Sequence, residues 1–441
     1  MHGNRIPAPI RAVRPRSRPV CARGRTALAA LLAAVSGAIA FAAAGGAAAA
    51  ASGLPALQRV LGRQLARAGS GSSAYVYDLS ARQTLFSARA SVARPPASLE
   101  KLYTATTALE RLGPSARLAT SVLGTGTLSP EGVWEGSLYL RGGGDPTFGS
   151  SAFIRSHYGG IGASVSALAD QLARAGGIRE ITGSIEGDES YLDALRGEPS
   201  SGYAADPFLE GSLGALAFNR GERGSAGGVH APAAYAARQL WAALRGTGVR
   251  IDGSTGSAVT PAAARPLASV RSPTIAQLLG LMLPSSDNFF AETLIKDLGA
   301  RFGGAGTTAA GAAVVRATMA ASFGLRPQVV DGSGLSRSDR TSTLQLARLL
   351  IALASRPLGA VLRGDLAVAG RTGTLAHRMR GTAAAGRCQA KTGTLIGASN
   401  LAGYCQSTRG HLLVFAFFDD GIAVELAHAV QDRMAIALAA Y

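Results

Sequence analysis

Lysines are the side chains in this sequence whose type most directly points to chemistry. The 441 residues include 44 lysines and arginines, yet only Lys101, Lys296 and Lys391 are lysines. An arginine side chain stays protonated in a protein, whereas a buried or charge-crowded lysine can become a neutral amine that accepts a proton. The three lysines are therefore candidates for catalysis by a base.

Two of these lysines belong to motifs that suit nucleophilic catalysis by a serine. Lys101 follows Ser98 by three residues, and on a helix this spacing places the amine almost one turn beyond the hydroxyl, on the same face. Lys101 can then accept the proton of the Ser98 hydroxyl if its own pKa is lowered. A nearby ammonium lowers a lysine pKa by like-charge repulsion, and we expect Lys391 to supply it.

The other motif residues can handle the substrate and its leaving group. Ser286 can pass a proton to a leaving amine, and Asn288 can hold a substrate amide. Lys391 offers positive charge, and Thr392 and Thr394 offer hydroxyls, for docking a carboxylate. The backbone N–H groups of the nucleophilic serine and of Thr394 can form an oxyanion hole, in which each donor is typically worth about 3–4 kcal/mol.

Single motifs of this kind have simpler explanations. A serine before a helix is more commonly an N-cap than a nucleophile. The segment Arg371–Thr374 nearly repeats K-T-G, but it lacks the lysine and no strand hairpin follows it, so we do not assign it as a motif. Lys296 lies eight residues after Asn288 on a predicted helix, and we interpret it as a surface lysine.

Three motifs in a fixed order are far more specific than any one of them. Such a set is typical of serine acyl-transfer enzymes that react with penicillin. In this chain the set consists of S-x-x-K from Ser98 to Lys101, S-x-N from Ser286 to Asn288, and K-T-G at Lys391, Thr392 and Gly393, with Thr394 following.

The first 51 residues are predicted to be an export segment rather than part of the fold. They contain seven arginines and no acidic residue, and from Thr26 they continue as an apolar, alanine-rich stretch that ends in small residues. This pattern is typical of a cleaved signal peptide, and an uncleaved membrane anchor is the alternative. In either case the rest of the chain is expected to be exported, to the periplasm or the extracellular cell envelope.

Charge and residue usage limit the partners of the exported chain. Loss of the seven arginines lowers the formal net charge from +17 to +10. This charge could favour peripheral association with anionic wall polymers or lipid headgroups, although a solvated arginine-rich surface is the simpler explanation. Basic runs interleaved with aromatic residues are missing, which argues against nucleic acid. The six histidines form no metal-spaced cluster, so we predict no metal and no cofactor.

The pattern of apolar residues predicts an α/β (α+β) fold. Strand hairpins near both chain ends, flanked by helices, predict one antiparallel sheet covered by helices, formed by residues 52–117 and 266–441. Residues 118–265 have short strands and glycine turns, and we expect one or two small inserted domains there. The predicted strands are 73–87 (a hairpin), 121–128, 136–140, 181–185, 387–395, 398–405 and 411–418, and the predicted helices are 99–112, 164–174, 233–245, 273–283, 289–302, 309–323, 343–355 and 422–440.

Two cysteines remain after the export segment, and strand register predicts that they form a disulfide. If a two-residue turn at Ile396 and Gly397 joins two strands, Cys388 lies directly opposite Cys405. Cross-strand Cα atoms are about 4.5–5.5 Å apart, which is within disulfide reach. Export supplies the oxidising environment that such a bond requires.

The motifs and the segments between them resemble the D-alanyl-D-alanine carboxypeptidase/endopeptidases of the penicillin-binding protein 4 type, the S13 serine peptidases. The resemblance runs from about residue 55 to the C-terminus and includes residues 138–147, 331–337 and 390–404. It implies a transpeptidase/β-lactamase-like fold with domains inserted between the first two motifs, in agreement with the 188 positions from Ser98 to Ser286. It also implies peptidoglycan peptides and β-lactams as partners and an acyl-enzyme on Ser98.

Three further residues are interpreted through this resemblance. It implies that Asp145 and Arg337 help to hold the diaminopimelate side chain of the peptide, although Asp145 could equally be a turn residue before a proline. Glu100 departs from the pattern, because a carboxylate that faced the site would raise the pKa of Lys101. We therefore expect Glu100 to point away from the site.

Other functions stay open at this point. A class A serine β-lactamase shares the motifs but needs a glutamate that activates the deacylating water, and Glu292 is the only glutamate between Asn288 and Lys391. A catalytically inactive, wall-associated penicillin-binding protein would have lost a catalytic residue, and none is lost here. The sequence does not separate carboxypeptidase from endopeptidase activity and leaves the oligomeric state open.

Overall fold

The computed structural model of this protein describes residues 53–221 and 231–441. These residues belong to a single contact unit, Ala50–Tyr441. The predicted export segment, residues 1–51, lies outside the described residues. Two β-sheets organise the described part of the chain, and apolar cores form against both of them.

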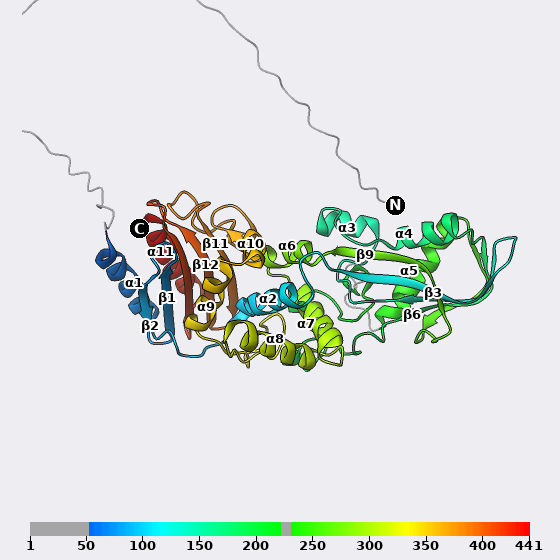
Figure 1. The fold of residues 1–441 in the computed structure, drawn as a ribbon, viewed down its shortest axis with the longest axis horizontal. Coiled ribbons are helices and arrows are strands. Elements are labelled where there is room, and N and C mark those ends of the chain that lie inside the picture. The colour runs from blue at the N-terminus through cyan, green and yellow to red at the C-terminus, as the bar shows by residue number, and fades with distance from the viewer. Residues whose placement is uncertain (1–52, 222–230) are drawn as a thin grey trace, which may run out of the picture. The chain divides into compact units, whose positions relative to one another are not determined.

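The first sheet joins strands from both ends of the described chain. Its six strands run antiparallel in the order β10-β11-β12-β13-β1-β2. Figure 1 shows the blue strand β1 beside the red strands of the C-terminal region. The strands are β1 (Ser72–Asp78), β2 (Gln83–Ala88), β10 (Ala367–Val368), β11 (Cys388–Leu395), β12 (Ala398–Gln406) and β13 (Leu412–Asp420).

Alternating side chains give this sheet two apolar faces. In β13, Phe415 and Phe417 pack into one core, while Val414 and Phe418 pack into the other. Successive side chains of a strand point to opposite faces, so a continuous apolar run is buried on both sides. Full burial of each such side chain stabilises the folded state by roughly 1.5–3 kcal/mol. Because both faces of the sheet are apolar, other elements are expected to cover both of them.

Helices cover both faces as this argument requires. Helices α1 (Leu54–Ala68) and α11 (Val424–Ala440) pack against each other over one face. The core on the other face includes side chains of α2 (Lys101–Arg111), α6 (Ile275–Ser285), α7 (Asn288–Phe302), α8 (Thr308–Phe323), α9 (Thr343–Ala354) and α10 (Pro357–Gly364), and α9 packs directly on strands β1, β12 and β13. Within residues 53–221 and 231–441 no single helix is long and apolar enough to cross a membrane. Helices α9 and α10 reach that length and apolar composition only when they are taken together, and they are bent by 115° relative to each other.

The predicted disulfide is present between β11 and β12. Leu395 pairs with Ala398 across the two-residue turn, and Cys388 pairs with Cys405 at the far end of the same ladder. The two cysteine Cα atoms are 4.0 Å apart and the sulfurs are bonded. The bond ties together the two strands that present the K-T-G motif.

A second sheet lies between the first and second motifs in the sequence. Its main path is β7-β5-β4-β3-β9, with β6 paired to β4 and β8 paired to β6. Its elements are β3 (Arg117–Leu128), β4 (Val133–Arg141), β5 (Glu180–Ile181), β6 (Ile185–Asp188), β7 (Arg250–Ile251), β8 (Thr255–Ser257) and β9 (Arg265–Thr274), with helices α3 (Ser151–Tyr158), α4 (Val165–Asp170) and α5 (Pro232–Gly246). We call residues 117–274 the insert.

The insert ends later than the boundary at residue 265 that the sequence predicted. Strand β9 pairs with β3 over most of its length, so it completes the second sheet. We call the described residues outside the insert, 53–116 and 275–441, the main domain. The alternation of residue types along β9 can indicate a strand, but it does not indicate which sheet the strand joins. The structure also contains α1, α3 and α10, which the sequence patterns did not predict.

Candidate active site

The first motif begins where a short 3₁₀ turn runs into a helix. Ser98 lies in the turn η1 (Ala97–Glu100), which continues directly into α2. The side-chain amide of Asn400 on β12 donates hydrogen bonds to the carbonyl groups of Pro95 and Pro96, at 2.9 and 2.8 Å. These bonds fix the chain just before Ser98, which is half-buried and was predicted at such a helix start.

Lys101 lies at the centre of the contacts that join the first two motifs. Its Nζ atom lies 3.0 Å from Ser98 Oγ and 2.6 Å from Asn288 Oδ1. The same Nζ atom donates to the carbonyl oxygen of Ser333, at 2.7 Å. The structure therefore brings together the serine, the lysine and the asparagine that the sequence assigned to one site.

Burial is the main cause of the shifted pKa of Lys101. The residue has no exposed surface, and burial lowers its pKa to about 8, against raising contributions from Asp331, Glu292 and other acidic groups. We expected repulsion from Lys391 to lower this pKa, but it is not among the main causes. The reason is that the ammonium form loses its hydration inside the protein, which outweighs the charges around it.

Lys391 lies on β11, fully buried, and donates from Nζ to the carbonyl oxygen of Thr392 at 2.8 Å. Burial and the charge of Lys101 lower the pKa of Lys391 well below its usual value. The hydroxyl of Thr392 donates to that of Thr374 at 2.8 Å. The R-T-G-T segment that we did not assign as a motif therefore contacts the K-T-G motif without replacing it.

Gly393 allows β11 to pass directly beside the turn that contains Ser98. A Cβ atom at Gly393 would lie 2.7 Å from the carbonyl oxygen of Pro96 and 3.0 Å from the backbone nitrogen of Ser98. Such distances are too short for any side chain, so this approach requires glycine. It brings the backbone of the strand that bears the exposed Thr394 next to the amide of Ser98, as an oxyanion hole requires.

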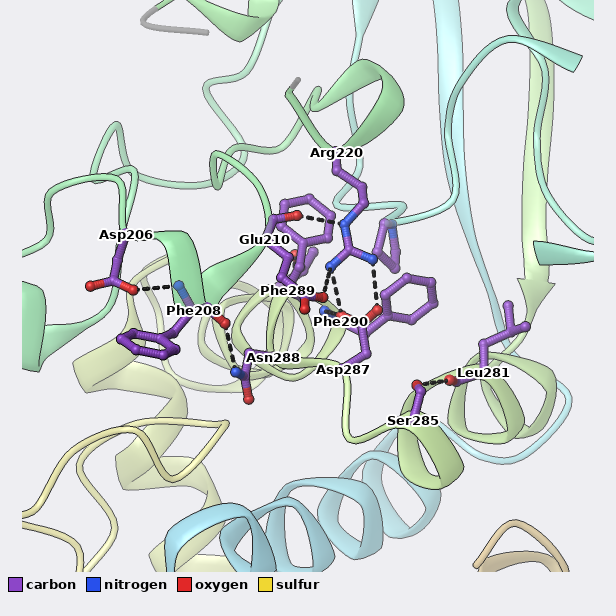
Figure 2. A network of polar contacts seen from close by, with 12 residues as sticks. Asp206, Phe208, Glu210, Arg220, Leu281, Ser285, Asp287, Asn288, Phe289 and Phe290 are labelled. Carbon is purple, nitrogen blue, oxygen red and sulfur yellow. Dashed lines mark hydrogen bonds and ion pairs between the residues drawn. The ribbon is translucent and has the colours of Figure 1, made fainter. Parts of the chain in front are cut away.

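The second motif forms the turn between α6 and α7. Ser286 ends α6 in the left-handed region, at φ 67°, and is half-buried. Asn288 begins α7, and its side-chain nitrogen donates to the carbonyl oxygen of Phe208 at 2.7 Å. Figure 2 shows Asn288 directed toward Phe208 of the insert. The amide of Asn288 is thus held from two sides, by Lys101 and by the insert.

Glu292 lies one turn beyond Asn288 and supports the contacts of Lys101. Its Oε1 atom accepts hydrogen bonds from the backbone N–H groups of Gly332 and Ser333, at 2.9 and 2.7 Å. The side chain is fully buried, and burial raises its pKa to about 8. Glu292 therefore holds the loop whose carbonyl group binds Lys101, and it is not placed as a glutamate that activates a deacylating water.

Glu100 interacts electrostatically both with a cluster of buried acids and with Lys101. Its carboxylate is fully buried, and burial together with Asp339 and Asp331 raises its pKa well above the usual range. Glu100 is nevertheless among the acidic groups that raise the pKa of Lys101. The expectation that Glu100 points away from the reacting groups therefore stays a prediction.

Asp145 and Arg337 occupy different surroundings. Asp145 is 3% exposed, and its Oδ1 atom accepts from the backbone and hydroxyl of Thr147, at 2.8 and 2.7 Å. Burial raises its pKa to about 6. Arg337 is exposed, and its Nη2 atom lies 3.8 Å from where a Cβ would stand at Gly397. The structure therefore places Arg337 at the rim near the end of β11, whereas Asp145 makes the contacts of a turn residue.

Lys296 is not the surface lysine that we expected. It is fully buried, and its Nζ atom donates to Asp193 Oδ1 at 2.6 Å and to the carbonyl oxygen of Leu195 at 2.8 Å. The prediction was wrong because the insert covers this side of α7, and a helix pattern does not reveal what packs on it. Lys296 joins α7 to the insert and has no contact with Ser98 among the described interactions.

Sequence reasoning missed several groups that complete the site. The carbonyl group of Ser333 binds Lys101, Asn400 holds the prolines before Ser98, and Arg220 of the insert pairs with Asp287. The resemblance included the segment that contains Ser333, but a backbone carbonyl group can accept a hydrogen bond whatever the residue type. The residue type therefore could not show that Ser333 binds Lys101. Asn400 pairs with Gly393 in the predicted strand register, so its place beside the motif could have been found.

Comparison with known proteins agrees with this geometry. Residues 58–205 and 210–441 match the D-Ala-D-Ala carboxypeptidase 3 (S13) family. The D-alanyl-D-alanine carboxypeptidase of Actinomadura sp. is 30% identical in an alignment of 459 positions, gaps included, that covers 85% of this chain and 82% of that protein. Carboxypeptidase DacB of Mycolicibacterium smegmatis is 30% identical in an alignment of 357 positions, gaps included, that covers 75% of this chain and 72% of that protein.

Solved structures show the same fold. The crystal structure of penicillin binding protein 4 (dacB) from Haemophilus influenzae matches with a TM-score of 0.73 and 20% identity, covering 86% of this chain and 99% of that one. A complex of that protein with a novel β-lactam matches with a TM-score of 0.67 and 20% identity, covering 85% of this chain and 97% of that one. The motif geometry and the family match together show that this chain belongs to the S13 family of D-Ala-D-Ala carboxypeptidases.

Proposed function

We propose that this chain is a serine D-Ala-D-Ala carboxypeptidase/endopeptidase that cleaves peptidoglycan stem peptides through an acyl-enzyme on Ser98. The observation that carries the proposal is the 3.0 Å contact between Ser98 Oγ and the Nζ atom of Lys101, whose pKa burial lowers to about 8. A nucleophile and a base within hydrogen-bond reach are what acyl transfer needs. Family membership and the names of the relatives support the same reaction.

The proposed acylation uses each motif for one task. Neutral Lys101 takes the proton from Ser98 Oγ as this oxygen bonds to the carbonyl carbon of a D-alanine. The backbone N–H groups of Ser98 and Thr394 stabilise the negative charge on the carbonyl oxygen. When the peptide bond breaks, Ser286 gives its hydroxyl proton to the leaving amine and takes up the proton held by Lys101. Lys101 is then neutral again. It takes a proton from the attacking water and returns it to Ser98 Oγ as the ester breaks, which releases the peptide and restores the Ser98 hydroxyl.

Lys391 and two threonines are proposed to bind the free carboxylate of the leaving residue. Lys391 is buried with a strongly lowered pKa, so an arriving carboxylate would favour its protonated form. Thr392 lies beside it and Thr394 is exposed on the same strand. This arrangement suits a peptide whose bond after D-alanine precedes a residue with a free carboxylate.

Labelling with a fluorescent penicillin tests the nucleophile and the base. The wild type should become labelled, and Ser98→Ala should abolish labelling because no hydroxyl remains to acylate. Lys101→Arg should also remain unlabelled, because the permanently charged arginine cannot accept the proton of the Ser98 hydroxyl. The matched control is Lys296→Arg, which keeps the charge of a buried lysine that has no contact with Ser98 among the described interactions, measured on protein shown by circular dichroism to be folded. Full labelling of Ser98→Ala would reject the proposal, and mass analysis of products from defined muropeptides identifies the bond cleaved.

Two alternatives give different results in the same assays. A β-lactamase would release hydrolysed penicillin quickly instead of keeping a long-lived acyl-enzyme. The hydrogen bonds of Glu292 to backbone groups argue against that reading. An inactive wall-associated protein would neither become labelled nor cleave muropeptides.

The cellular location is also part of the proposal. The arginine-rich start and the alanine-rich stretch that follows support export to the cell envelope, and the disulfide between Cys388 and Cys405 suits an oxidising compartment. The net charge of +10 outside the export segment could favour peripheral contact with anionic wall or lipid. The N-terminal residue of protein recovered from the envelope, determined by mass, tests cleavage of the export segment.

A further inference from the structure

Arg220 of the insert contacts the middle residue of the S-x-N motif. Its Nη1 atom donates to Asp287 Oδ2 at 2.6 Å, and its Nη2 atom donates to Asp287 Oδ1 at 3.0 Å. Figure 2 shows this two-pronged contact between the loop that bears Arg220 and the turn between α6 and α7. Arg220 lies 67 positions before Asp287 in the sequence, in the turn η5 (Phe218–Gly221).

The contact is buried and directional. The side chains of Arg220 and Asp287 are 8% and 12% exposed. The Nε atom of Arg220 donates to the carbonyl oxygen of Glu210 at 2.7 Å, and the guanidinium lies over the ring of Phe289, 5.0 Å from its centre. A bidentate pair between arginine and carboxylate fixes orientation as well as distance, which an ordinary surface ion pair does not.

Backbone turns of an uncommon kind are held on both sides of this pair. Asn219 and Arg220 have φ values of 50° and 62°, and Ser286 has a φ of 67°. Residues other than glycine rarely adopt this left-handed region, so contacts must hold them there. One such contact is the hydrogen bond from the backbone of Ser150 to Asn219 Oδ1, at 2.8 Å.

Asp287 links the contact with Arg220 to the start of α7, in the turn that contains Ser286 and Asn288. Its Oδ1 atom also accepts from the backbone N–H of Phe290 at 3.0 Å, so Asp287 caps α7. Asn288 follows as the first residue of α7 and contacts both Lys101 and the carbonyl group of Phe208. The insert therefore holds two successive residues of the S-x-N motif.

We propose that Arg220 is a positioning residue for acylation, which fixes the turn bearing Ser286 and Asn288 relative to Lys101 by clamping Asp287. This inference rests on the proposed function, because its readout is acylation of Ser98. It makes the insert a part of the catalytic machinery as well as an addition to the fold.

The test measures the second-order rate constant for acylation by a fluorescent penicillin. Arg220→Ala should lower this constant roughly 10- to 100-fold, the cost of displacing a reacting group by about 1 Å. Arg220→Lys keeps the charge but loses the fork, so its rate should fall between those of the alanine variant and the wild type. Asp287→Asn keeps the helix cap but loses the charge pair, and it should resemble Arg220→Ala.

A double variant and a rescue experiment separate positioning from simple stability. If Arg220 acts through Asp287, the variant with both Arg220→Ala and Asp287→Asn should be no slower than Asp287→Asn alone, because the two residues share one contact. Added guanidinium ion should restore acylation by Arg220→Ala, where a carboxylate faces the vacated space. It should not restore acylation by Asp287→Asn.

Arg196→Ala is the matched control in the same domain. Arg196 forms a bidentate pair with Glu189, at 2.8 and 2.6 Å, and does not contact Asp287. Its loss should lower stability while leaving acylation unchanged. The inference fails if Arg220→Ala acylates like the wild type, or if the losses add and guanidinium rescues nothing. A wild type that does not acylate at all would instead reject the proposed function.

Discussion

At the scale of single residues, the site depends on a lysine that is buried and held in three directions. Lys101 contacts Ser98, Asn288 and the carbonyl group of Ser333. Burial disfavours its ammonium form, while the nearby acids favour it, and the balance leaves a pKa of about 8. A base is most effective when its pKa lies close to the pH at which it works.

The first prediction concerns the dependence of acylation on pH. Only the neutral amine of Lys101 can accept the proton of Ser98, so the rate constant for penicillin acylation should rise with pH and follow a pKa of about 8. The measurement is a profile of this rate constant on both sides of that pH, for protein shown to stay folded. A profile that follows an ordinary lysine pKa of about 10.4 would contradict the assignment.

The second prediction concerns the buried acid that supports Lys101. Glu292→Gln keeps an oxygen acceptor for the backbone of Gly332 and Ser333 but removes a carboxyl group whose ionised form raises the pKa of Lys101. The pKa of Glu292 is itself about 8, so its charge is present mainly in the upper part of the profile. The rise of the acylation rate constant should therefore shift by a modest amount to lower pH. Glu135→Gln, at an exposed site in the insert, is the control and should leave the profile unchanged. A shift to higher pH in Glu292→Gln would show that the glutamate acts in another way.

At the scale of elements, strand β11 holds the K-T-G residues in the first sheet. Its Lys391 faces the site from within, Gly393 allows contact with the turn at Ser98, and Cys388 is bonded to the neighbouring strand. Strand β10 pairs only with residues 389 and 390 of β11, so the motif half of β11 is free to contact the turn at Ser98. The disulfide braces the strand at Cys388, the end opposite to Thr394.

The third prediction tests this brace. The bond joins residues 17 positions apart, and replacing both Cys388 and Cys405 by serine should lower the free energy of unfolding by about 3 kcal/mol for a loop of this size. Urea unfolding followed by circular dichroism measures the change. A reductant should shift the midpoint of the wild type and leave the serine variant unaffected. Free thiols found by alkylation and mass in unreduced exported protein would show that the bond does not form.

At the scale of the whole described molecule, the insert and the main domain share buried charged contacts. Lys296 on α7 pairs with Asp193 of the insert, and Asp287 pairs with Arg220. Removing one partner of a buried pair typically costs 3–5 kcal/mol because a charge is left without compensation. The S-x-N turn therefore depends on both parts of the chain, although Ser98 and Lys101 both lie in the main domain.

The fourth prediction concerns the choice of stem peptide. Arg337 is exposed near Gly397, at the open end of β11, where it could clamp the side-chain carboxylate of diaminopimelate. Peptides with diaminopimelate should have a higher kcat/KM than matched lysine peptides, since an unpaired Arg337 would cost roughly 1–3 kcal/mol. Arg337→Ala should remove the preference.

The control for that experiment is Arg409→Ala, because Arg409 is an exposed arginine in the turn at the opposite end of β12. It should keep the wild-type preference. Equal kcat/KM values for the two peptides with wild-type protein would exclude a side-chain pocket at Arg337. The role predicted for Asp145 is tested in the same way, and its burial favours a structural effect on folding.

Much of the fold and the site could be predicted from the sequence because the relevant signals are local. The proximity of Ser98 and Lys101 follows from the length of one helical turn. The pairing of Cys388 with Cys405 follows from the two-residue turn between β11 and β12, which sets the register of the two strands. The apolar runs of the C-terminal strands required helices on both faces. Periodicity and turn chemistry act over a few residues, so they can be read directly from the chain.

Only the tertiary structure decided which distant segments meet. The pKa of Lys101 is set by burial under residues near 288 and 333, far from it in the sequence, and not by Lys391 as we expected. Lys296 is buried because the insert, about 100 positions earlier, supplies Asp193. The pairing of Arg220 with Asp287 likewise has no local signal. Burial and long-range pairing depend on how elements pack together, and packing is a property of the folded chain that no short window of sequence contains.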